Sequence, residues 1–154
     1  MGKEREKYAG FWLRIIAIII DYIIIMILSY ILLHLPFKFM FNTVYSPTLD
    51  QILHNLQIYM TYNFLNIIFV WLYFALFESS TKQATIGKSI IGIKVTDLEG
   101  NRISFARATG RHFAKLISLL TLGIGYLMVI WTKKKQTLHD KIADCLVVKD
   151  NKYA

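Results

Sequence analysis

The chain has 154 residues, of which 55% are hydrophobic, and its formal net charge is +8. This length suits a single domain, expected over residues 1–154, and the long apolar blocks exclude an ordinary soluble globule. Most basic residues flank the apolar blocks, so the charge favours anionic lipid headgroups over nucleic acid as its partner. The single cysteine, Cys145, excludes an intramolecular disulfide.

The first apolar block, residues 11–35, predicts a membrane-spanning helix, because about 20 apolar residues cross a bilayer. Two charged residues interrupt it: Arg14 near its start and Asp21 in its middle. At ~1.5 Å per residue, Asp21 would lie ~15 Å deep, close to the bilayer centre. A carboxylate at that depth costs roughly 2.5–3.5 kcal/mol on insertion scales, so Asp21 needs a partner.

Arg14 and Asp21 are two helical turns apart and share one helix face with Ala17. An axial gap of ~10.5 Å would strain a direct bond between them. We therefore expect Arg14 to extend to the inner headgroups and Asp21 to face another segment. Two interpretations stay open: an anchor with a residue that fixes helix packing, or a route for an ion or substrate.

Residues 58–77 predict a second spanning helix, the inner part of a longer helix that begins at Ser46-Pro47. Asn63 and Asn66 share one face of this span. Asn66 comes near the expected depth of Asp21 and is the first candidate for its partner. The alternative is an asparagine whose amide bonds to the backbone of its own helix.

Residues 78–111 are polar and basic, and residues 91–105 predict a small cytoplasmic β-hairpin with its turn around Gly100. Gly87-Lys88-Ser89 is similar to the end of a phosphate-binding loop. The first glycine of that motif would fall on Lys82, so nucleotide binding is rejected.

A third apolar segment, residues 112–131, is interrupted by Gly123-Ile124-Gly125. Lys and Arg concentrate in the N-terminal tail, in residues 78–111 and after residue 131, and the positive-inside rule makes all three cytoplasmic. A third full span would put the basic C-terminal tail outside. The sequence therefore favours a re-entrant pair of half-helices, with a full third span as the alternative.

Lys115 lies in the third segment and shares a cationic face with Arg107 and Arg111. It is the second candidate partner of Asp21. In the tail, Asp140 is expected to cap a helix or to pair with a basic residue. Its neighbour His139 could suggest acid–base catalysis, but no nucleophile lies nearby in the sequence. Residues 142–148 are a short run with a preference for β-structure.

Three stretches, in this order, resemble the RDD family of small, mostly prokaryotic membrane proteins, named for one Arg and two Asp. They are AGFWLRIIAIIID, TIGKSIIGIKVTDLEGNRIS and QTLHDKIADCLVV. The resemblance implies that Arg14, Asp21 and Asp140 are the residues of interest, and that transport, including cation/proton antiport, is a candidate activity. With the topology above, it also implies an Arg14–Asp140 pair that attaches the tail to the base of the first span.

The sequence thus predicts an all-α membrane protein with two full transmembrane helices, a third broken or re-entrant segment and a small cytoplasmic β-hairpin. It predicts a multi-pass protein of the cell membrane with both termini cytoplasmic, and no enzyme, cofactor or metal site.

Two functions compete. The first is transport of a cation or proton through Asp21, in a homo-oligomer or with a membrane partner. The second is a non-catalytic scaffold or accessory protein that binds a partner or anionic lipid. The residues of the predicted site are Arg14, Asp21, Asn63, Asn66, Lys115 and Asp140.

Overall fold

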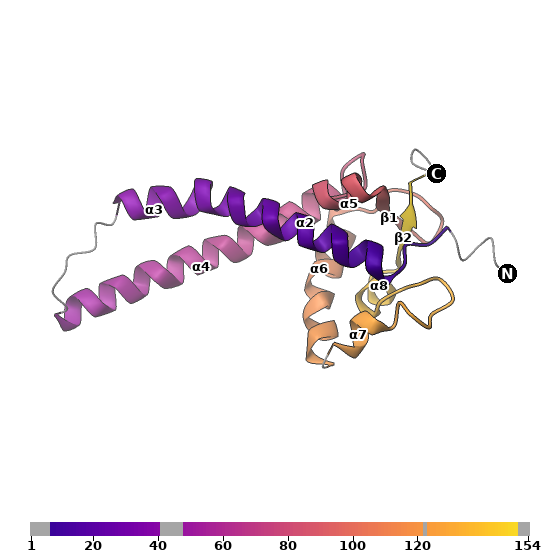
Figure 1. The fold of residues 1–154 in the computed structure, drawn as a ribbon. Helices are drawn as coiled ribbons and strands as arrows, with labels where there is room; N and C mark the ends of the chain where they lie inside the picture. The colour runs from indigo at the N-terminus through magenta and orange to yellow at the C-terminus, as the bar shows by residue number, and fades with distance from the viewer. Residues whose placement is uncertain (1–6, 41–47, 122, 151–154) are drawn as a thin grey trace. The chain divides into compact units, whose positions relative to one another are not determined.

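A computed structural model of the chain describes residues 7–40, 48–121 and 123–150. This part of the chain is mostly helical and carries one two-stranded antiparallel sheet (Figure 1). Contacts divide the chain into two compact units: the first unit contains residues 1–21 and 73–154, and the second unit contains residues 22–72. The single domain over residues 1–154 stays a prediction.

Two helical stretches are long and apolar enough to cross a bilayer. One is Phe11–His34, made of α2 (Phe11–Ser29) and the π-helix η1 (Tyr30–His34), and it continues into α3 (Leu35–Met40). The other is α4 (Leu49–Glu78). Only 22% and 17% of their most apolar stretches are buried. This exposure suits contact with lipid, whereas the core helix of a soluble protein is mostly buried. The cap expected at Ser46-Pro47 lies outside the described residues.

Helix α2 buries both of its charged side chains and exposes many of its large apolar ones. Its buried residues follow a spacing of three or four, which is one helix face; they are Arg14, Ala17, Asp21, Ile25 and Ser29. Trp12, Ile16, Ile19 and Ile23 are exposed on the other faces. This distribution is the reverse of that in a water-soluble protein and is the one that a hydrocarbon solvent favours.

In the first unit, β1 (Ile93–Asp97) pairs with β2 (Cys145–Lys149), with Ile93 opposite Lys149 and Asp97 opposite Cys145. The predicted hairpin over residues 91–105 is therefore wrong. The turn is present, since the Asn101 N–H donates to the Asp97 carboxylate over 2.7 Å. The chain then enters a helix, not a second strand, because the Ser104 hydroxyl caps α6 (Phe105–Leu120).

Three short helices complete the first unit: α5 (Ile86–Ile91), α7 (Ile124–Leu127) and α8 (Leu138–Ile142). Gly92 ends α5 in the left-handed region with φ 73°. The expected break in the third apolar segment is present, since α6 ends at Leu120 and Gly123 starts α7 with φ 80°. Re-entry of this segment into the membrane stays a prediction.

Candidate functional site: a buried network of charges

Six charged side chains are buried in the described part of the chain, and all of them belong to the first unit. Three are acidic and three are basic, so the cluster is neutral as a whole. They come from α2, α4, α5, α6 and α8, and are Arg14, Asp21, Glu78, Lys88, Arg111 and Asp140.

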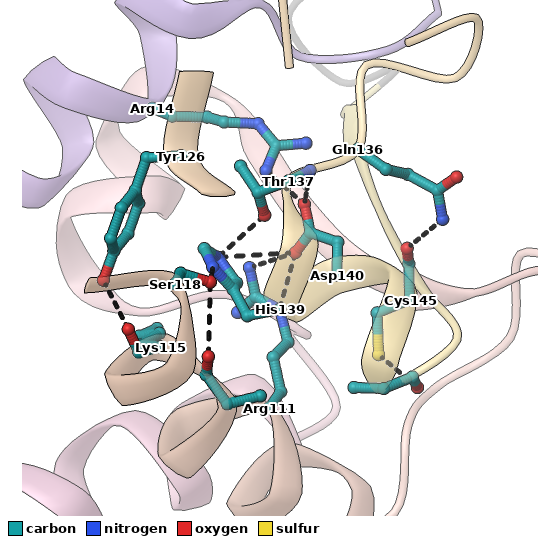
Figure 2. Close-up of polar contacts among 12 residues, drawn as sticks. Arg14, Arg111, Lys115, Ser118, Tyr126, Gln136, Thr137, His139, Asp140 and Cys145 are labelled. Atoms are coloured by element: carbon teal, nitrogen blue, oxygen red, sulfur yellow. Dashed lines mark hydrogen bonds and ion pairs between the residues drawn. The ribbon is translucent and has the colours of Figure 1, made fainter. Parts of the chain in front are cut away.

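Asp140 on α8 lies between two guanidinium groups (Figure 2). Its Oδ2 accepts a hydrogen bond from Arg14 Nη1 at 2.5 Å, and its Oδ1 accepts from Arg111 Nε at 2.9 Å. Oδ2 also accepts from the backbone N–H of Thr137, which makes Asp140 part of the capping box of α8. Both roles expected for Asp140, cap and ion pair, are present.

Arg111 extends the network from Asp140 to Glu78 at the end of α4. Arg111 Nη1 donates to Glu78 Oε2 over 2.6 Å, and Lys88 Nζ donates to Glu78 Oε1 over 2.5 Å. Charges of opposite sign therefore alternate from Arg14 through Asp140, Arg111 and Glu78 to Lys88. Each of these five ions has an opposite charge at hydrogen-bond distance, as buried charges require.

The network fixes the charge states of Arg111 and Asp140. Burial by itself would raise the pKa of Asp140, but the guanidinium groups of Arg14 and Arg111 outweigh it and hold that pKa well below its usual range. Burial would lower the pKa of Arg111, and the carboxylates of Glu78 and Asp140 outweigh it and raise that pKa. Arg111 and Asp140 therefore stay ionised at neutral pH.

Asp21 is fully buried and is bound by hydroxyl and backbone groups. Its Oδ1 accepts from the Tyr73 hydroxyl at 2.8 Å and from the Gly87 N–H at 2.7 Å. Its Oδ2 accepts from the Thr85 hydroxyl at 2.5 Å. Thr85 also caps α5 by accepting from the Lys88 N–H. Asp21 therefore docks the start of α5 against α2.

The contact between α5 and α2 leaves no room for a side chain at position 87. A Cβ on Gly87 would lie 2.3 Å from the Ala17 carbonyl oxygen and 2.8 Å from Asp21 Cγ. The small side chain of Ala17 allows this close approach, and the approaching backbone is that of α5.

Comparisons with known proteins identify the family of the chain. The sequence pattern of the RDD family matches residues 8–144. The chain belongs to the RDD family. It is 36% identical to the protein YxaI of Bacillus subtilis (strain 168), over 93% of this chain and 98% of that protein. It is 29% identical to the membrane protein YteJ of the same strain, over 96% of this chain and 85% of that protein.

A shorter similarity covers 47% of the chain and 30% of a proline-rich antigen homolog of Mycobacterium tuberculosis, at 34% identity. No solved structure matches the chain at a significant level. In this RDD protein, Arg14, Asp21 and Asp140 all lie in the first unit. The expected Arg14–Asp140 pair is present, and Asp21 has partners of its own.

The partners predicted for Asp21 in the RDD chain were wrong. Tyr73, which bonds Asp21, follows Asn66 on α4 by seven residues, so the partner lies two turns, or ~10 Å, further along α4 than predicted. The Asn63 amide donates to the carbonyl of Tyr59 in its own helix. Lys115 Nζ lies 4.0 Å from the centre of the Phe74 ring, a cation–π contact.

Arg14 does not extend to the headgroups, because 92% of its surface is buried (exposed fraction 8%). Besides Asp140, its guanidinium donates to the carbonyls of Lys135 at 2.6 Å and Ala9 at 3.2 Å. The bond to Lys135 attaches the start of α2 to the loop before α8. Residues 7 and 9 also bond to β2, through Lys149 N–H to Lys7 O and Ala9 N–H to Val147 O.

His139 bonds to two hydroxyl groups, with Nδ1 3.2 Å from Ser118 Oγ and Nε2 2.9 Å from Thr137 Oγ1 (Figure 2). Ser118 is fully buried, so its hydroxyl is closed to a substrate in this structure. Burial lowers the pKa of His139 to about 3. The described residues contain no group of three or more His, Cys, Asp or Glu side chains that could hold a metal ion.

Several members of the site were missed by the sequence reasoning; they are Tyr73, Glu78, Thr85, Gly87, Lys88 and Arg111. Residues 85, 87 and 88 stand in the second stretch that carries the RDD resemblance, which is the signal that could have found them. The position of Glu78 was a second signal, because this acidic residue directly follows the second apolar block. Cys145 is fully buried.

Proposed function

We propose that this RDD protein is a non-catalytic membrane scaffold or accessory protein. Its first unit is a rigid head, held together by the buried charge network and attached to the inner ends of the two spans. The head presents basic groups to anionic lipid or to a membrane partner. The proposal places the protein in the cell membrane with both termini cytoplasmic.

One observation carries this proposal: every one of the six buried charges is already bonded within the first unit. A transport site must release and exchange its ion, and must therefore keep a coordination position open during the cycle. Asp21 instead accepts three hydrogen bonds, one from the N–H of Gly87 at a contact that leaves no space. Residues that hold helices in this way favour a structural role.

The surface of the first unit supports anionic lipid as the partner. Eight of its described Lys and Arg residues are exposed, against two exposed acidic residues. Such an excess attracts anionic headgroups by about 1 kcal/mol per basic residue near the membrane surface. The exposed basic residues are Lys7, Lys82, Arg102, Arg107, Lys133, Lys134, Lys141 and Lys149, and the acidic ones are Glu99 and Asp144.

Transport of a cation or proton is the rival function, and one observation favours it. The three groups that bond Asp21 are two hydroxyls and one N–H, and none of them carries a charge. A carboxylate in an apolar helix without a cationic partner at hydrogen-bond distance is the kind of residue that proton relays use.

A flux measurement separates the two functions. The purified protein is reconstituted into vesicles with an internal pH-sensitive dye, and proton flux is driven by Na⁺ or K⁺ gradients. The scaffold proposal predicts the same flux as protein-free vesicles, for wild type and for Asp21→Asn. It also predicts that Asp21→Asn unfolds more easily than Asp50→Asn, the matched change at an exposed carboxylate in the first turn of α4.

Wild-type flux that Asp21→Asn abolishes and Asp50→Asn preserves would contradict the scaffold proposal and establish the rival.

A further inference from the structure

Helix α6 has the same reversed distribution of side chains as α2. Its buried face contains Ala108, Arg111, Ala114 and Ser118. The last turns expose Leu116 at 59%, Ile117 at 49% and Leu120 at 81%. In water this pattern would leave a large apolar patch uncovered while burying an Arg. It is the pattern of a helix that meets acyl chains on one side and a polar core on the other.

The apolar surface continues past the break at Gly123. Ile124, Leu127 and Trp131 are exposed by 56%, 41% and 56%. Helix α7 packs back on α6, since a Cβ on Gly125 would lie 2.9 Å from Ser118 Cα. Exposed apolar side chains of α6, α7 and the turn after α7 are called the apolar edge. They are Leu116, Ile117, Leu119, Leu120, Ile124, Leu127 and Trp131.

Hydrogen bonds place the end of the apolar edge beside the start of the first span. Arg14 Nη2 donates to Lys135 O over 2.6 Å, four residues after Trp131. Trp12 and Ile16, at the start of α2, are exposed by 72% and 45%. The apolar edge and the outer face of α2 are thus parts of one unit, and both present apolar side chains at the place where the span begins.

Charge selects lipid over another protein surface as the occupant. Residues 116–132 contain no Asp, Glu, Lys or Arg, and Lys115 and Lys133-Lys134-Lys135 border them on both sides. Lys133 and Lys134 are exposed. A charge-free apolar stretch between basic groups is suited to the boundary between anionic headgroups and acyl chains.

The length and direction of α6 indicate how deeply this helix enters the bilayer. Its 16 residues span ~24 Å, less than a bilayer core. Within the first unit, α6 runs across the direction of α2 and not beside it (Figure 1). A helix with this course lies in the membrane plane, whereas a re-entrant half-helix would run along the span.

We infer that the apolar edge of α6 and α7 is a lipid-binding surface, which lies among the acyl chains just beneath the headgroups of the leaflet in which α2 begins.

Tryptophan quenching by brominated lipid tests this inference. Trp12, Trp71 and Trp131 are replaced by Phe, and a single reporter is introduced as Leu120→Trp. The matched control is Leu98→Trp, at a leucine of the first unit that is 47% exposed but flanked by Asp97 and Glu99. The protein is reconstituted in vesicles of phosphatidylcholine and phosphatidylglycerol, with the phosphatidylcholine brominated near the headgroup end or near the terminal end of its acyl chains.

The expected result is a roughly twofold or greater loss of emission from position 120 with shallow bromines and a smaller loss with deep bromines, as insertion of ~5–10 Å requires. Position 98 should lose little with either lipid. Native Trp131, kept as the sole reporter in a Trp12→Phe/Trp71→Phe chain, should follow position 120 without any change in the apolar edge.

Three results would overturn the inference. Stronger quenching by deep bromines at position 120 would mean a spanning or re-entrant segment. Blue-shifted emission that bromine does not quench would mean that a second copy of the chain covers the apolar edge. Water-like, unquenched emission from both reporters would mean that the edge stays outside the membrane.

Discussion

At the scale of single residues, the value of a buried ion depends on whether its partners are present. Desolvation removes much of what an intact buried pair gains, whereas removing one partner leaves an uncompensated charge. Asp140 is the most sensitive position, because two buried guanidinium groups depend on it. Arg14 and Asp140, two of the residues for which the RDD family is named, form one ion pair. The effect of replacing either residue therefore depends on the other.

Asp140→Asn should lower the free energy of unfolding by about 3–5 kcal/mol, since Arg14 and Arg111 both lose their shared counter-ion. The change is measured by denaturant titration in detergent micelles. Asp150→Asn is the control: Asp150 pairs with Lys94 at 3.2 Å, with side chains 27% and 30% exposed. Exposed pairs contribute about 0–1 kcal/mol. Equal effects of the two substitutions would show that burial of Asp140 contributes nothing.

At the scale of elements, two residues of α2 bind other parts of the first unit. Arg14 holds the loop before α8 and α8 itself, and Asp21 holds the start of α5. The two residues are two turns apart, so their elements attach at different levels along one face. Close packing of Gly87 on Ala17 makes the second attachment a backbone contact, which tolerates less change than a contact between side chains.

Gly87→Ala should lower the free energy of unfolding by about 1–3 kcal/mol, because its Cβ would force α5 away from the Ala17 carbonyl and from Asp21. Gly110→Ala is the matched control in α6, where a Cβ would meet nothing within 4 Å. It should be neutral or stabilising by up to about 1 kcal/mol, from helix propensity alone. A destabilisation at Gly110 as large as that at Gly87 would contradict the packing account.

The sequence could predict those elements whose formation depends on residues close together in the chain. Two long apolar runs predicted the spans, and Gly123 predicted the break after α6. The hairpin failed because the partner of β1 is β2, about fifty residues further along the chain. No local pattern reports such a pairing. The preference of Ser104 for a helix cap was the local signal against a second strand there.

The candidate site was predictable in part, for the same physical reason. A charge inside an apolar run stands out, which identified Arg14 and Asp21. Partners such as Tyr73 and Thr85 are common residue types, and only the packing of α4 and α5 against α2 selects them. Asn66 and Tyr73 are seven residues apart on α4 and share a helix face. The prediction therefore identified the correct face of α4 but placed the partner of Asp21 two turns too early.

At the scale of the whole molecule, the network predicts sensitivity to acid. The pKa of His139 is about 3 in the folded protein, against 6.5 for an unperturbed histidine. Between these values the unfolded chain binds a proton that the folded chain does not, so stability falls as the pH falls. Asp140, with its depressed pKa, acts in the same direction below about pH 4.

The free energy of unfolding should therefore decrease from pH 6.5 towards pH 4, with a slope of up to about 1.4 kcal/mol per pH unit from His139. His139→Asn should remove its share of this slope and leave the loss below pH 4. The share of His112 should remain, because burial and the nearby Lys115 lower the pKa of His112 to about 4. The measurement is a series of denaturant titrations at fixed ionic strength. A slope in His139→Asn that equals the wild-type slope would assign the acid sensitivity to other groups.

A double-mutant cycle measures whether the carboxylate of Asp21 holds α5 on α2. Asp21→Asn, Thr85→Val and the double variant are unfolded by denaturant in the same micelles. We expect a coupling energy of about 1–3 kcal/mol, because the two side chains bond each other in a buried site. Effects that add within about 0.5 kcal/mol would contradict it, since independent residues behave in that way.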